Sequence, residues 1–136
     1  MYYPWEEKYQ INIEVVDQEH KKLFECCNNI LAFDPQSDDF NNFKSLVKEL
    51  YDYVRYHFQH EEEIMQKYEY SLIGEHKQWH NLIIYEMNKY LAQSRNSSTL
   101  LTHFKGLADK WIKQHIQEED MKFRNYLGRI GELTPE

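Results

Sequence analysis

Residues 50–65, LYDYVRYHFQHEEEIM, lie at the centre of the pattern that decides the fold. Around them, apolar residues recur at steps of three and four, as they do along one face of an α-helix. The members of this series are Phe43, Leu46, Val47, Leu50, Val54, Phe58, Met65 and Tyr68. Their spacing predicts an amphipathic helix over about residues 40–68, with His57 and Glu61 on its apolar face.

Three further segments repeat this periodicity. They cover about residues 18–33, 72–92 and 99–127. Asp17 is the expected N-cap of the first segment, and Ser97 and Ser98 are capping candidates for the last. Such short polar side chains accept hydrogen bonds from the free backbone N–H groups at the start of a helix. Residues 1–16 are expected to form an irregular arm.

Short polar connectors join the four predicted helices, and a short connection makes neighbouring helices run antiparallel. We therefore expect an all-α fold, namely an up-down-up-down antiparallel four-helix bundle. The length of 136 residues suits a single domain over residues 1–136. Four glycines and three prolines are too few for the many turns of an all-β fold.

Composition limits the partners and the location. Sixteen basic and twenty-three acidic residues give a net charge of −7, which argues against a nucleic-acid partner. No apolar run of about 18 residues predicts a transmembrane segment, and residues 1–10 lack the pattern of a secretion signal. Cys26 and Cys27 are adjacent and therefore badly placed to form a disulfide with each other. These features predict a cytoplasmic protein.

Seven polar residues interrupt the apolar faces of the predicted helices. They are His20, His57, Glu61, His76, His80, His115 and Asp120. One buried histidine alone is usually a hydrogen-bonded core residue, but each unpartnered polar group in a core costs about 1–3 kcal/mol. Seven such groups would cancel most of a domain stability of roughly 5–15 kcal/mol. A bound metal removes this conflict, and mixed imidazole and carboxylate ligands favour iron or a similar first-row ion.

The size of this set indicates two metal ions. Five imidazoles and two carboxylates are too many ligands for one ion, but they suit two bridged ions. Two octahedral ions need twelve bonds, of which the imidazoles supply five, two bridging carboxylates four and one bridging oxygen two. One position stays open, which suits the binding of a small terminal ligand better than multi-step substrate chemistry.

At these positions the sequence resembles the hemerythrin family, and most of all the single-domain bacterial hemerythrins. The resemblance rests on a histidine in the first helix and on the motifs H-F-x-x-E, H-x-x-x-H and H-x-x-x-x-D in the next three. These positions are His20, His57 with Glu61, His76 with His80, and His115 with Asp120. Trp5, Tyr9 and residues 17–21 are also similar to the bacterial members.

The resemblance implies a non-haem centre of two iron ions with a bridging oxo or hydroxo group. Glu61 and Asp120 are then the bridging carboxylates. The other ligands divide into His76, His80 and His115 on the saturated iron, and His20 and His57 on the iron with the open position. The implied function is reversible dioxygen binding for carriage, storage or delivery, without enzymatic turnover. Dioxygen and a client protein that consumes it are the implied partners.

Three other functions stay open. The same site is compatible with sensing of dioxygen, nitric oxide or redox state, although no signalling domain accompanies it. A di-iron oxidase or peroxidase is the second alternative, but the Glu-x-x-His motif of ferritin-like oxidases is absent from the sequence. A purely structural bundle is the third, and the seven polar residues argue against it.

Aromatic residues lie within about a turn of the candidate ligands. Phe58, inside the H-F-x-x-E motif, is the best candidate for a wall of the dioxygen pocket. Core packing is the expected role of Phe24, Trp79 and Trp111.

Several polar residues near the motifs fall outside the candidate ligand set. His60 lies beside the apolar face and His103 away from it, so neither is expected to be a ligand. Glu62 and Glu63 after the candidate ligand Glu61 are expected to be solvated, as are residues 118–119.

The last predicted helix needs an irregularity. His115 and Asp120 are five residues apart, which in a regular helix places them about 140° apart around the axis. The apolar pattern also shifts by one position between these two residues. We therefore predict a single-turn π-bulge between His115 and Asp120, because a π-turn lets residues i and i+5 share a face.

Overall fold

The computed structural model describes residues 4–34 and 39–131, apart from the side chains of residues 112–114. The all-α fold class is confirmed, and the predicted helix boundaries agree with the structure to within a few residues. The elements are the 3-10 helix η1 (Glu7–Tyr9), α1 (Glu14–Leu31), α2 (Phe40–Lys67), α3 (Ile73–Gln93), α4 (Ser97–Asp109), the π-helix η2 (Lys110–Asp120) and α5 (Met121–Arg129).

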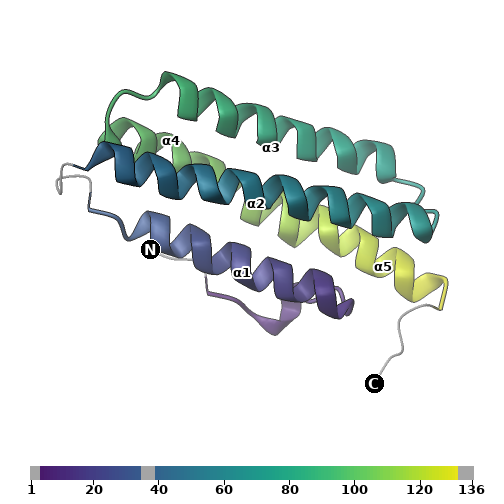
Figure 1. The fold of residues 1–136 in the computed structure, drawn as a ribbon. Coiled ribbons are helices and arrows are strands. Elements are labelled where there is room, and N and C mark those ends of the chain that lie inside the picture. The colour runs from purple at the N-terminus through teal and green to yellow at the C-terminus, as the bar shows by residue number, and fades with distance from the viewer. Residues whose placement is uncertain (1–3, 35–38, 132–136) are drawn as a thin grey trace.

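Consecutive long helices run in opposite directions (Figure 1). α1 packs against α2, α2 against α3, and α3 against α4, while α4 also contacts α1 and so closes the ring. The fourth position of the bundle is shared by α4, the π-helix and α5, which follow one another along one direction. None of the helices in the described part of the chain combines the length and the hydropathy needed to span a membrane.

Polar side chains begin two of the helices. Asp39 caps α2, since its Oδ1 accepts the N–H of Asn42 at 3.0 Å. Asn96, and not Ser97 or Ser98, caps α4 by accepting the N–H of Thr99 at 2.8 Å. The two serines are already helical, so the prediction placed this cap one or two residues too late.

The first helix begins earlier than predicted, at Glu14, so Asp17 is not its N-cap. Asp17 instead lies in the first turn, where its carboxylate accepts the backbone N–H groups of Ile11 at 2.8 Å and Asn12 at 3.1 Å. Asn12 has a φ of 67°, a left-handed conformation that asparagine tolerates better than most residues. The Asp17 carboxylate therefore joins the arm to α1 by hydrogen bonds and does not cap the helix as predicted.

The described part of the arm, from residue 4, packs against the bundle. The rings of Trp5 and Tyr9 lie 5.3 Å and 5.5 Å from the ring of Phe24 on α1. The side-chain amide of Gln117 donates to the Tyr9 hydroxyl at 3.1 Å, so the arm also contacts the π-helix. The expectation of an irregular arm over residues 1–16 is therefore wrong for residues 7–9 and 14–16, which are helical.

The predicted π-bulge is present but longer than expected. π-helical geometry extends over Lys110–Asp120 and so begins before His115. It brings His115 Nε2 within 3.3 Å of Asp120 Oδ1, although the two residues are five apart in sequence. The shift in the apolar pattern revealed that one extra residue was present, but not over how many turns it is accommodated.

The core consists of two apolar clusters. The larger cluster fills the bundle from the connection between α1 and α2 to the middle of the helices, and includes Leu23, Val54 and Phe104. The smaller cluster lies toward the start of α1 and the end of α5. Its members are Ile11, Val16, Met65, Tyr70, Phe123 and Leu127. Along the helices, the seven candidate ligands form a buried polar layer at the boundary between these clusters.

Candidate metal centre

The structure brings all seven candidate ligands together. Each is at most 1% exposed, and together they come from α1, α2, α3 and the π-helix. They are His20, His57, Glu61, His76, His80, His115 and Asp120. The four-helix arrangement turns separate positions on four apolar faces into a single buried layer.

Glu61 divides its two oxygens between two sets of imidazoles. Its Oε1 lies 2.8 Å from His76 Nε2 and 3.0 Å from His80 Nε2. Its Oε2 lies 3.3 Å from His20 Nε2 and 3.6 Å from His57 Nε2. The carboxylate therefore stands between the imidazoles of α3 and those of α1 and α2.

Asp120 divides its oxygens in the same way. Its Oδ1 lies 3.0 Å from His76 Nε2 and 3.3 Å from His115 Nε2, while its Oδ2 lies 3.2 Å from His20 Nε2. Both carboxylates thus present one oxygen to each side of the layer. This is the arrangement that two bridging carboxylates between two cations require.

Two overlapping groups of side chains result. In the three-imidazole group, one ligand atom from each of Glu61, His76, His80 and His115 lies within 4.8 Å of all the others. In the two-imidazole group, the same holds for His20, His57 and Glu61. The shared Glu61 is the link between the groups.

The contacts inside the layer fit a bound cation. His80 Nε2 and His115 Nε2 lie 2.9 Å apart, although the Nδ1 of His80 already bonds to a carboxylate. Glu61 Oε2, both oxygens of Asp120 and both ring nitrogens of His20 are buried without a hydrogen-bond partner. Carboxylate oxygens and neutral imidazole lone pairs all accept, so their convergence with so few donors needs a positive ion.

The ionisation of the metal-free layer points the same way. Burial disfavours the charge of Glu61, but hydrogen bonds from the surrounding histidines hold its pKa well below the usual range. Burial likewise opposes protonation of His76, but Asp120 and Glu61 raise its pKa to about 10. For His115 burial dominates and lowers the pKa to about 4. Without a metal, the carboxylates therefore retain a proton on His76 that a metal ion would displace.

Comparison with known proteins identifies the family. A family model described as the hemerythrin HHE cation binding domain matches residues 12–127. The chain belongs to the hemerythrin family. The resemblance indicated by the sequence motifs is thereby confirmed. The description of the family as cation binding agrees with the buried cluster of histidines and carboxylates.

Several bacterial hemerythrins align with most of the chain, all of them named bacteriohemerythrin. The protein from Pseudomonas aeruginosa is 28% identical over 116 residues, which cover 85% of this chain and 75% of that protein. The protein from Clostridium acetobutylicum is 25% identical over 124 residues, covering 88% and 96%. The protein from Campylobacter jejuni is 26% identical over 117 residues, covering 85% and 88%.

Two carboxylates outside the predicted ligand set accept hydrogen bonds from the Nδ1 atoms of ligand imidazoles in this hemerythrin centre. His57 Nδ1 donates to Glu19 Oε1 at 2.8 Å, and His80 Nδ1 donates to Glu62 Oε2 at 2.7 Å. Each group thus has one imidazole whose Nδ1 proton is fixed, which leaves the Nε2 lone pair facing the centre. The prediction that Glu62 is merely solvated is wrong.

Glu19 is the site residue that the sequence reasoning missed. It is 6% exposed and also accepts a hydrogen bond from His60 Nδ1 at 2.8 Å. Burial acts to raise its pKa, but the bonds from His57 and His60 hold the pKa below its ordinary value. Its position directly before His20 gave no usable signal, because a charged residue beside an apolar face is usually solvated.

The aromatic and histidine predictions have mixed outcomes. Phe58 stacks on His80 with ring centroids 3.8 Å apart and an interplanar angle of 2°. Trp79 is only partly buried and lines a surface pocket, so its predicted core role is wrong. His60 bonds to Glu19, and His103 stacks on Tyr90 at 4.4 Å. Neither histidine belongs to the two ligand groups.

Proposed function

We propose that this hemerythrin binds two iron ions, bridged by Glu61, Asp120 and an oxo or hydroxo group, and that it binds dioxygen reversibly. The observation that carries the proposal is the division of both carboxylates, each with one oxygen toward each ligand group. A bridging role explains this division, whereas a single ion would leave one oxygen of each carboxylate buried and unpaired.

The two groups suggest where dioxygen binds. Three imidazoles, one oxygen each of Glu61 and Asp120, and a bridging oxygen would complete six positions on one ion. On the other side the ligand group contains two imidazoles, His20 and His57, so one position would stay open there. Iron at that position supplies the reversible redox chemistry that dioxygen binding needs.

The chain's own residues hold the centre and keep water from it. Phe58 covers one face of His80, and its ring also lies 5.6 Å from that of His115. Trp111 packs edge-on against Phe58 at 6.4 Å and is 2% exposed. Such a dry wall excludes the protons and water that promote loss of bound dioxygen in a reactive form.

Carriage, storage or delivery of dioxygen is the role that a single open position supports, and we propose a non-enzymatic protein. Its partner in delivery would be a client protein that consumes dioxygen. Cys26 and Cys27 are both free thiols, which agrees with the reducing cytoplasm as the proposed location. The name bacteriohemerythrin shared by the relatives also supports the proposal.

The test combines metal analysis with gas exchange. Protein reconstituted with ferrous iron should contain about two iron ions per chain, and its absorption spectrum should change on exposure to dioxygen and return under vacuum. One zinc ion and no iron after equal exposure to both metals would refute the iron centre. Consumption of dioxygen with continuous oxidation of a reductant would instead identify an oxidase.

A further inference from the structure

A surface pocket between α2 and α3 reaches the centre from outside. Its volume is about 460 Å³, and it is lined in part by Phe58, Glu62 and His80. Two other surface pockets lined by described residues contain none of the seven candidate ligands. Solvent therefore reaches the outer edge of His80 here, while the ligand layer behind the ring stays buried.

A short bonded path joins this pocket to the layer. The side chain of Glu62 is 25% exposed, and its Oε2 bonds to His80 Nδ1 at 2.7 Å. Across the same ring, His80 Nε2 lies 3.0 Å from Glu61 Oε1 inside the three-imidazole group. One imidazole ring thus separates the exposed carboxylate from the ligand atoms.

The pocket lies on the wrong side for a ligand entrance. His80 belongs to the three-imidazole group, whose ion would have no vacant position in the proposed centre, whereas the open position would fall to the ion held by His20 and His57. A small ligand needs a vacant position, but an electron does not. An oxygen-binding iron protein also needs electrons, because loss of dioxygen as superoxide or peroxide leaves ferric iron that no longer binds it.

We propose that electrons enter the centre through this pocket, across His80 and Glu62, from a small uncharged planar reductant of the reduced flavin class. The inference rests on the proposed di-iron function and assigns the side from which that centre is reduced. In the reaction one flavin hydroquinone gives two electrons and two protons and becomes the oxidised flavin. In the proposed centre the two electrons would convert two bound ferric ions to ferrous, and the two protons would pass to water or to the bridging oxygen.

The chemistry of the pocket matches such a donor. The volume lies within the range of small-molecule sites, which is roughly 300–1,000 Å³. Tyr56, 58% exposed, and Ile84 offer surface for a planar ring. Arg55 and Asn81 provide donors for its polar edge. The lining also includes Asp52 and Glu62, so carboxylates outnumber the single guanidinium and disfavour a phosphorylated donor.

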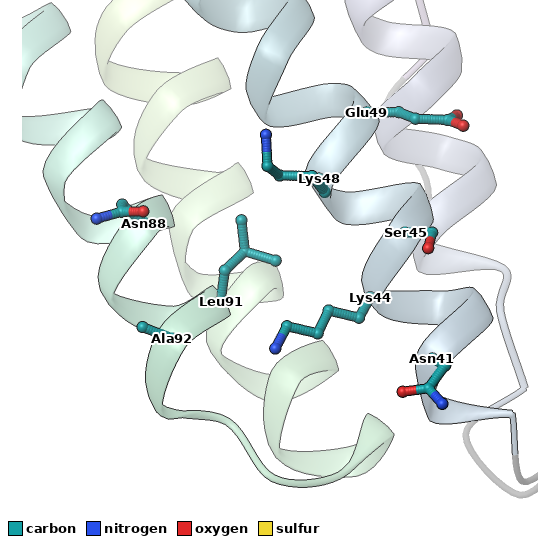
Figure 2. A pocket seen from close by; sticks show the side chains of 8 residues that line it. All are labelled: Asn41, Lys44, Ser45, Lys48, Glu49, Asn88, Leu91 and Ala92. Carbon is teal, nitrogen blue, oxygen red and sulfur yellow. The ribbon is translucent and has the colours of Figure 1, made fainter.

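A matched pair of substitutions on α3 tests the pocket. Asn81 lines it, while Asn88, seven residues along the same helix, lines the pocket shown in Figure 2 with Leu91 and Lys48. Both asparagines are exposed. Asn81→Trp should slow reduction of the ferric protein by reduced riboflavin at least about tenfold, and Asn88→Trp should leave the rate unchanged. Gln59→Trp fills the same pocket from α2 and should repeat the effect.

A redox-inert form of the protein gives an independent measurement. Riboflavin should bind to the zinc-loaded protein with quenching of its fluorescence, and Asn81→Trp should weaken this binding while Asn88→Trp does not. Equal reduction rates and equal riboflavin binding in wild type, Asn81→Trp and Gln59→Trp would overturn the proposal. If the pre-reduced wild type fails to bind dioxygen reversibly but Asn81→Trp still slows reduction, the proposed function fails and the entry site stands.

A charge substitution tests the path itself. Glu62→Gln should raise the midpoint potential of the iron centre, because the carboxylate on His80 favours the more positively charged ferric form. The neighbouring Glu63→Gln removes the same charge from an exposed position and should change the potential much less. Equal shifts in both variants would contradict a path through Glu62 and His80.

Discussion

The two ligand groups share Glu61 but differ in almost everything around it. The three-imidazole group is backed by the partly exposed Glu62 and a surface pocket. The two-imidazole group is backed by the buried Glu19, and one turn from its His20 the arm packs on Phe24. In the proposed two-ion centre, the three-imidazole side would hold its metal more firmly, and the two-imidazole side would have room for a ligand. Burial places this second side farther from solvent.

The largest effect is expected from removing an imidazole of the three-imidazole group. His76→Ala or His80→Ala should lower the iron content to about half or less and the melting temperature by roughly 10 °C, because metal binding stabilises the folded state. Iron analysis and thermal unfolding measure both. His103→Ala should change neither, since His103 stacks on Tyr90 outside the ligand groups. Equal losses in all three variants would show that the ligand set is misassigned.

The next effect concerns the support of the two-imidazole group. Glu19→Gln should weaken iron binding by about 10–100-fold, since a carboxylate that fixes a ligand imidazole contributes about that much. Titration with ferrous iron under anaerobic conditions measures the affinity of each step. Glu25→Gln, exposed on the same helix, is the control. If only the tighter of the two binding steps weakens, Glu19 supports the other group.

Substitution of Phe58 should affect assembly of the metal centre little, but it should clearly shorten the lifetime of the oxygenated protein. Phe58→Ala opens the wall against His80 and His115, so water reaches the centre and autoxidation of the oxygenated protein should accelerate several-fold. The iron content should stay near that of the wild type. An unchanged autoxidation rate at full iron content would place the protective wall elsewhere.

The smallest effect is the pH dependence of the metal-free protein. His76 has its pKa raised to about 10, so the stability it contributes is complete below pH 6.5 and is lost as the pH rises toward 10. His115 has its pKa lowered to about 4, so stability is lost as the pH falls from 6.5 to 4 because the unfolded chain binds the proton more tightly.

Thermal unfolding should therefore show a maximum near pH 6.5, with the melting temperature falling by a few degrees on either side. With iron bound, the alkaline loss should disappear, because the metal replaces the proton on His76. Acid should release the iron. A metal-free protein whose melting temperature rises steadily up to pH 9 would contradict the assignment of His76.

The sequence predicted the ligand layer because each member falls on the apolar face of its own helix. His57 and Glu61 follow Val54 at three- and four-residue steps, and in the folded structure all three side chains are buried. The π-helix was predictable for the same reason, since the phase of the apolar pattern changes between His115 and Asp120. The start of the π-helix at Lys110 could not be predicted. The shift in the apolar pattern shows that one residue is extra, but not how many residues adopt π-helical geometry.

The periodicity of the sequence does not predict which side chains contact each other between helices. Glu19 and Glu62 lie beside the apolar faces, where charged residues are usually solvated, and only the packing of α1 on α2 and of α2 on α3 gives them partners. Asp17 failed as a predicted cap because its partners, Ile11 and Asn12, lie in the preceding turn of the arm. The sequence alone gave no position for that arm.

The buried polar layer between the two apolar clusters also affects how the protein opens. Without a cation, no metal–ligand bonds join the helices across this layer. The smaller cluster then depends on its own packing, that of six buried side chains with partly buried neighbours such as Ile13, Ile64 and Met121 against them. We expect that end of the bundle to behave as a separate unit of local unfolding, with amide hydrogens that exchange ahead of those in the larger cluster. A metal pair bound to α1, α2, α3 and the π-helix would join the two units, so that the chain exchanges and unfolds as one cooperative body.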